Sequence, residues 1–93
     1  MTTENTDAFW ELAEEFINLA NARAEQTSPD AVNSALQFAA ARFGAFIVAS
    51  NTDDLADEKD GALKHLGWHY RQLLDAQLED YIANPLPKPK EKE

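Results

Sequence analysis

Two histidines, His65 and His69, have a spacing that could bind a metal ion, because side chains four residues apart on a helix lie on the same face. Trp68, which lies between the two histidines, is not a metal ligand. The segment also lacks the glutamate that supplies the catalytic base in an HExxH motif. The pair by itself does not complete a ligand set. We therefore predict no bound metal and histidines that face solvent or pack on tyrosine.

The acidic run from Asp53 to Gly61 has the composition of a calcium-binding loop, but its residues do not fall at the ligand positions of such a loop. With Gly61 at the invariant glycine of such a loop, Ala56 would take the first ligand position and Gly67 the twelfth, which requires a bidentate carboxylate. We predict instead that these acids begin a helix, where the helix dipole favours negative charge.

Catalytic motifs are not indicated. The chain has no cysteine, its serines lack a nucleophile-elbow context, and its three glycines form no phosphate-binding loop. Carboxylate pairs such as Glu11 and Glu15 occur on any acidic helix, and nothing assigns one of them the role of acid and the other that of base. We predict a protein without enzymatic activity or cofactor.

Arg42 is the one charged residue between Ala31 and Thr52. Burying an unpaired guanidinium is costly, so Arg42 must either reach solvent or meet a carboxylate. One interpretation is a salt bridge to a glutamate of the first helix. The other is recognition of an anionic ligand or partner, in a pocket between helices that also contains His69 and Tyr70.

Net charge limits the classes of partner. Eight basic and seventeen acidic residues give a net charge of −9, which repels phosphate backbones and anionic lipids, so we expect neither nucleic acid nor membrane binding.

The opening MTTENTDAFW lacks the basic and apolar regions of a secretory signal, which predicts a cytoplasmic protein. The segment 31–52 could span a membrane by length, but its Asn, Ser and Gln residues favour a buried helix of a soluble protein.

The elements that carry these residues are predicted to be helices. Apolar residues recur at three- and four-residue spacing between Phe9 and Ala20, which indicates a first helix over about 7–25 with Thr6 as its N-cap. Ser28 followed by Pro29 is the start signal of a second helix, which extends to about residue 50.

A third helix is predicted over 54–83, with a stripe of apolar residues from Leu63 to Tyr81 and, as an alternative, a break near Gly61. Pro85 ends it after Asn84. The fold class is therefore an all-α three-helix bundle, with a single domain over 7–83 and a disordered Pro/Lys tail over 84–93.

The second helix is apolar on two opposite sides. At 100° per residue, its first face consists of Val32, Leu36, Ala39, Phe43, Phe46 and Ile47, and its second face consists of Phe38, Ala41, Ala45 and Val48. The two other helices of a bundle cover only about half of its circumference. The second face therefore predicts a subunit contact, most simply with a two-fold mate, and Trp68 on the third helix is expected to join it.

Three segments, FWELAEEFINLAN (9–21), ALQFAAARFGAFIVASN (35–51) and YRQLLDAQLEDYI (70–82), resemble a family of short acidic proteobacterial proteins catalogued as domain of unknown function number 3144. The resemblance covers about residues 7–83. It implies an all-helical, cytosolic bacterial protein with no assigned activity, catalytic residue or cofactor, so no functional residue can be transferred.

Two functional hypotheses remain open. The leading one is a non-enzymatic homo-oligomer, or a module that binds an unidentified protein partner, through the second face of the second helix and Trp68. The alternative is a small-molecule or anion-binding protein whose pocket contains Arg42, His69 and Tyr70.

Overall fold

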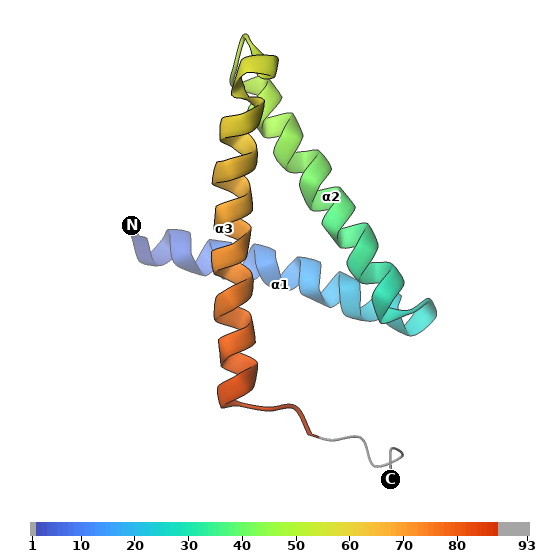
Figure 1. The fold of residues 1–93 in the computed structure, drawn as a ribbon. Coiled ribbons are helices and arrows are strands. Elements are labelled where there is room, and N and C mark those ends of the chain that lie inside the picture. Colours follow the sequence, from blue (N-terminus) through green and yellow to red (C-terminus); the bar gives the residue numbers. More distant parts are fainter. Residues whose placement is uncertain (1, 88–93) are drawn as a thin grey trace. The chain divides into compact units, whose positions relative to one another are not determined.

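A computed structural model of the chain describes residues 2–87, with side chains described from Asp7 onward. It contains three helices, α1 (Thr2–Gln26), α2 (Pro29–Ser50) and α3 (Leu55–Ala83), and no β-strand within residues 2–87 (Figure 1). The predicted all-α class is confirmed, and three long helices with short connections have the element order of a three-helix bundle. Helices α1 and α2 belong to one compact unit, residues 1–50, and α3 belongs to a second, residues 51–93.

Helix α1 begins earlier than its sequence predicts. It starts at Thr2, so Thr6 lies inside the helix and the prediction of Thr6 as the N-cap was wrong. No glycine or proline separates Thr2 from Asp7, and polar residues without a breaker extend a helix at little cost. On the described part of α1, Phe9 and Trp10 make an edge-to-face contact with ring centroids 5.1 Å apart.

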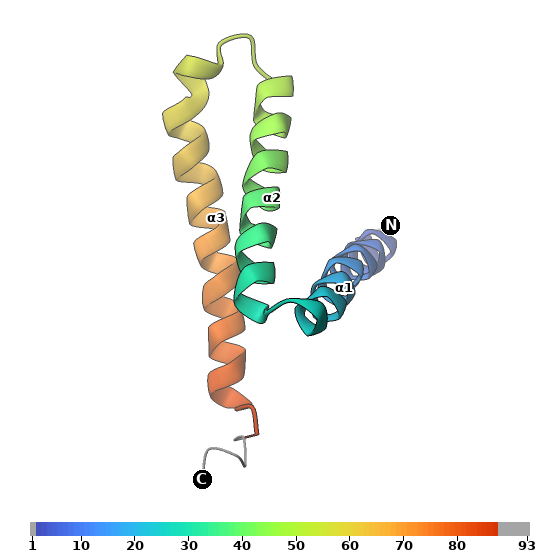
Figure 2. The same cartoon turned by 90° about the vertical axis from the view of Figure 1, so that its right-hand side faces the viewer.

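The connection between α1 and α2 consists of Thr27 and Ser28, and Figure 2 shows the chain turning there from one helix into the next. The Thr27 N–H donates to the Arg23 carbonyl at 3.0 Å, which closes the end of α1. The Ser28 hydroxyl accepts a hydrogen bond from the Ala31 N–H at 3.1 Å. Ser28 is therefore the predicted N-cap of α2, and the predicted bounds 29–50 are confirmed.

Substitution of this cap is expected to destabilise the unit. Ser28→Ala leaves the Ala31 N–H without its acceptor and should lower the free energy of unfolding by about 1 kcal/mol, as measured by urea denaturation. Gln37→Ala, on the polar strip of the same helix between its two apolar faces, is the control and should change stability by less than about 0.5 kcal/mol. Equal effects of the two substitutions would show that the cap contributes nothing.

The second unit consists of α3 and the residues around it. The Asp54 carboxylate accepts from the Asp57 N–H at 3.1 Å and caps the helix, so the acids that follow lie in its first turn as predicted. At the other end, Asn84 donates its backbone N–H to the Asp80 carbonyl at 2.8 Å, immediately before Pro85. The predicted end of the helix is confirmed.

The alternative of a break at Gly61 does not occur, because α3 is continuous from Leu55 to Ala83. A single glycine costs a helix only about 1 kcal/mol relative to alanine, and a helix of 29 residues tolerates that cost. Residues 84–87 follow outside any helix, whereas residues 88–93 of the predicted tail lie outside the described residues.

Candidate functional site

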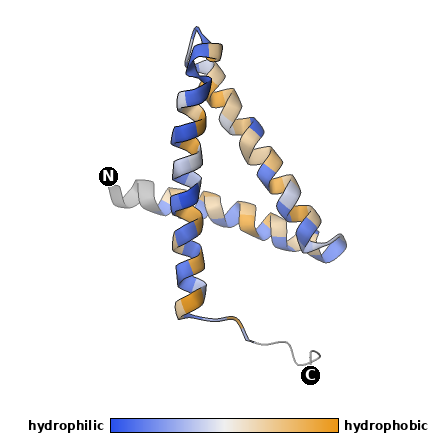
Figure 3. Ribbon diagram, viewed as in Figure 1, coloured by the Kyte–Doolittle hydropathy of each residue, from blue (hydrophilic) through white to orange (hydrophobic). Residues whose placement is uncertain are grey.

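The apolar side chains of all three helices are exposed. None of residues 7–87 is buried, and the large apolar side chains range from 38% exposed at Leu36 to 71% at Phe38. Figure 3 shows apolar segments recurring along each helix. An apolar surface of this extent requires cover by other helices, because its exposure to water costs about 25 cal/mol per Å².

The predicted interface residues lie on this exposed surface. On the second face of α2, Phe38, Ala41 and Ala45 are exposed and Val48 is half-buried, and on α3 Trp68 is 60% exposed. The first face of α2 includes an aromatic pair, Phe43 and Phe46, with centroids 6.0 Å apart. Both faces of α2 therefore include exposed apolar side chains, and the subunit contact itself stays a prediction.

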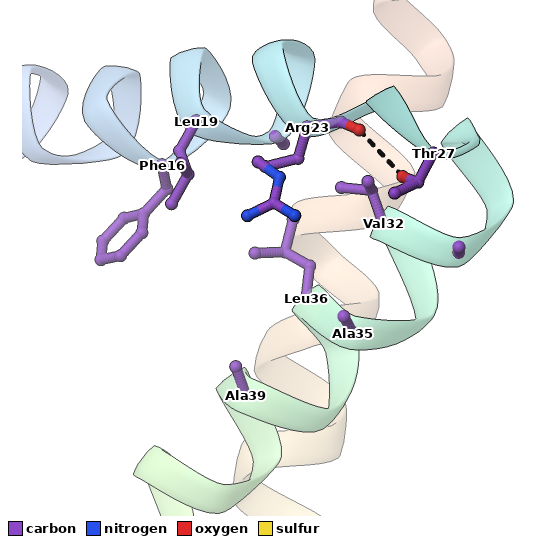
Figure 4. Close-up of a pocket in the computed structure, with 10 residues that line it drawn as sticks. Phe16, Leu19, Arg23, Thr27, Val32, Ala35, Leu36 and Ala39 are labelled. Atoms are coloured by element: carbon purple, nitrogen blue, oxygen red, sulfur yellow. Dashed lines mark hydrogen bonds between the residues drawn. The ribbon is translucent and has the colours of Figure 1, made fainter. Parts of the chain in front are cut away.

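A cleft of about 400 Å³ lies between α1 and α2 beside their connection (Figure 4). Its lining consists of eight apolar residues together with Arg23 and Thr27; the apolar ones are Phe16, Leu19, Ala20, Ala31, Val32, Ala35, Leu36 and Ala39. Figure 4 shows Phe16, Leu19 and Arg23 on the side of α1 that faces α2. The α2 side of the cleft is part of the first face of that helix.

Arg23 is the charged residue of this cleft, and it was not among the site residues predicted from the sequence. Its backbone carbonyl accepts from the Thr27 hydroxyl at 2.8 Å, but within the described side chains its guanidinium has no ion-pair partner. The signal that could have found it is its position. Arg23 lies seven residues after Phe16 and four after Leu19. It is therefore on the same side of α1 as the apolar stripe, just beyond the end of that stripe.

The residues of the predicted anion pocket lie in different units. Arg42 is on α2 and is exposed, and no carboxylate among the described side chains forms an ion pair with it. Its guanidinium reaches solvent, which avoids the cost of burial. The salt bridge to a glutamate of the first helix stays a prediction. His69 and Tyr70 are exposed on α3, and the pocket stays a prediction.

Metal ligands do not gather in the described part of the chain. His65 and His69 lie one turn apart on α3, and no group of three or more His, Cys, Asp or Glu side chains there could hold a metal ion. We expect EDTA to leave the melting temperature unchanged, as followed by circular dichroism. A fall of several degrees that zinc or calcium reverses would reveal a metal site.

Helix α2 has the length and composition of a membrane span. Its most apolar window of 18 residues has a mean hydropathy of 1.3, and it is the one such helix in the described part of the chain. A core helix of a soluble protein passes the same test, so this property does not identify its surroundings. It does show that α2 requires cover on more than one side.

The fold and the candidate site define a small all-α protein whose apolar helix faces are open to contacts. A family profile described as a protein of unknown function, DUF3144, matches residues 9–82, and the chain belongs to that family. No curated protein and no solved structure is significantly similar to the chain.

Proposed function

We propose that the chain is a non-enzymatic homo-oligomeric module of the cytoplasm, most simply a dimer. The observation that carries this proposal is that α2 is apolar on two opposite faces, whereas α1 meets it on the first face at the cleft. A stable domain of this size hides most of its apolar surface, and burial of each large side chain contributes about 1.5–3 kcal/mol. A second copy supplies the missing cover.

Helix α2 gives the strongest reason for a partner. It is apolar on its first face, which lines the cleft with α1, and again on its second face at Phe38, Ala41, Ala45 and Val48. The alanines allow a second helix to approach closely, while Phe38 and Val48 supply apolar area. A two-fold contact of the second face with itself satisfies both copies at once.

The charge of the chain restricts other partners. A net charge of −9 opposes contact with nucleic acid and with anionic membranes. A different protein that presents an apolar helix to the second face is a further candidate partner, and it would occupy the same surface.

The proposal is tested by co-expression of two copies with different affinity tags. One tag is used for capture, and we expect the copy with the other tag to co-purify in comparable amount. The control is an unrelated monomeric helical protein that carries this second tag, and it should remain in the flow-through. Recovery of the captured copy alone, at a protein concentration of about 10 µM or above, would contradict self-association.

A further inference from the structure

The second face of α2 has the spacing of a seam between paired helices. Phe38, Ala41, Ala45 and Val48 follow one another at intervals of three, four and three residues. Apolar residues at this spacing form one seam along a helix, and each of them inserts between side chains of a second helix. Helix α1 meets α2 on the other face, at the cleft. The seam can pair with an identical helix in either direction, and the sizes of its side chains distinguish the two.

A parallel pair of α2 helices would be uneven. Each residue of the seam then meets its own counterpart, so two phenylalanines oppose each other at Phe38 and two valines at Val48. Between them lie Ala41 and Ala45, which fill the seam only if the backbones approach closely. The two Phe38 rings would hold the helices apart at one end, and the alanines beside them would lose contact.

An antiparallel pair is even along its length. The two-fold axis crosses α2 at the level of Phe43, because Phe38 and Val48 lie equally far from this residue along the helix. Phe38 then meets the partner's Val48 at both ends of the seam, and Ala41 meets the partner's Ala45 between them. Since the two ends contain the same pair, one short distance between the helices suits the whole seam.

Electrostatics favour the same direction. Antiparallel helices place the positive N-terminal end of each dipole beside the negative C-terminal end of the other, and α2 has no basic residue of its own in its last turn. Asp30 lies eighteen residues before Val48, which is five full turns, so it is on the side of the seam. A parallel pair would bring two Asp30 carboxylates to one level, whereas an antiparallel pair keeps them at opposite ends. Arg42 is exposed, so solvent screens its charge in both arrangements.

We propose that two copies of α2 pair in the antiparallel direction through the second face, with Phe38 of each copy against the partner's Val48. This inference rests on the proposed homo-oligomer and specifies the direction and alignment of its contact. Because α1 joins α2 at Pro29, the α1 helices of the two copies are connected at opposite ends of the seam.

Cysteine cross-linking tests the direction, because the chain has no cysteine of its own. In an antiparallel dimer the two copies of residue 48 are about 15 Å apart along the helix axis, so Val48→Cys alone should form no disulfide-linked dimer on oxidation. An equimolar mixture of Val48→Cys and Phe38→Cys should form a linked dimer with one chain of each kind, which mass spectrometry identifies. The control mixture of Val48→Cys with Asn33→Cys, on the polar strip, should not link.

A spin-label distance gives the same answer without altering the seam, in case Phe38→Cys weakens the dimer. A label on Asn33→Cys lies ten residues from the level of Phe43. The two labels of an antiparallel dimer are therefore about 30 Å apart along the axis, whereas those of a parallel dimer are at one level. Double electron–electron resonance measures this distance.

Two results would overturn the inference and leave the proposed dimer standing. One is efficient linking of Val48→Cys alone with labels at one level, which would show a parallel pair. The other is a wild-type dimer in which neither Val48→Cys nor its mixture with Phe38→Cys links, which would place the contact on another surface. A wild-type chain that sediments as a monomer would instead remove the proposed function itself.

Discussion

Val48→Asp is expected to convert the wild-type oligomer to monomer or to unfold the chain. Val48 is half-buried at the end of the second face of α2, where Phe38, Ala41 and Ala45 are exposed. A carboxylate in the subunit contact would lose its hydration without gaining a partner, which costs several kcal/mol. The dissociation constant should therefore rise by about 100-fold or more, as measured by sedimentation.

Asn33→Asp is the matched control for this substitution. It adds the same charge to the same helix on the narrow polar strip between the two apolar faces, so the dissociation constant should change by less than about threefold. If Val48→Asp leaves both the oligomer and its melting temperature intact, the second face of α2 is not the contact.

The second large effect is a melting temperature that depends on protein concentration. If folding and association are coupled, dilution favours the unfolded chain by mass action. A tenfold increase in concentration adds about 1.4 kcal/mol per dimer, which should raise the melting temperature by about 3–6 °C. Circular dichroism between about 5 and 500 µM measures it, and a constant melting temperature would indicate a monomeric folding unit.

Local signals allowed most of the fold to be predicted from the sequence. Ser28 and Pro29 set the start of α2, and Asn84 before Pro85 sets the end of α3, because capping and the proline restriction act over a few residues. The start of α1 was missed since several polar residues could cap it and none breaks it. Whether the helix would break at Gly61 could not be decided from the sequence, because one glycine destabilises a helix by only about 1 kcal/mol and α3 has 29 residues.

The candidate site was predictable only in part. Residue spacing assigned Phe38, Ala41 and Ala45 to a second apolar face of α2, and the structure leaves all three exposed. Arg42 attracted attention because it interrupts an apolar segment, yet it reaches solvent. Arg23 was overlooked because one basic residue at a helix end is usual, and its place in the cleft depends on how α1 and α2 meet.

The most direct test of the account is sedimentation equilibrium of the wild-type chain from about 1 to 500 µM. A single chain has a mass of 10.4 kDa. The account predicts a weight-average mass that rises with concentration to about twice that value or more, because the apolar faces of α2 require a second copy. A mass that stays at one chain up to 500 µM would contradict it.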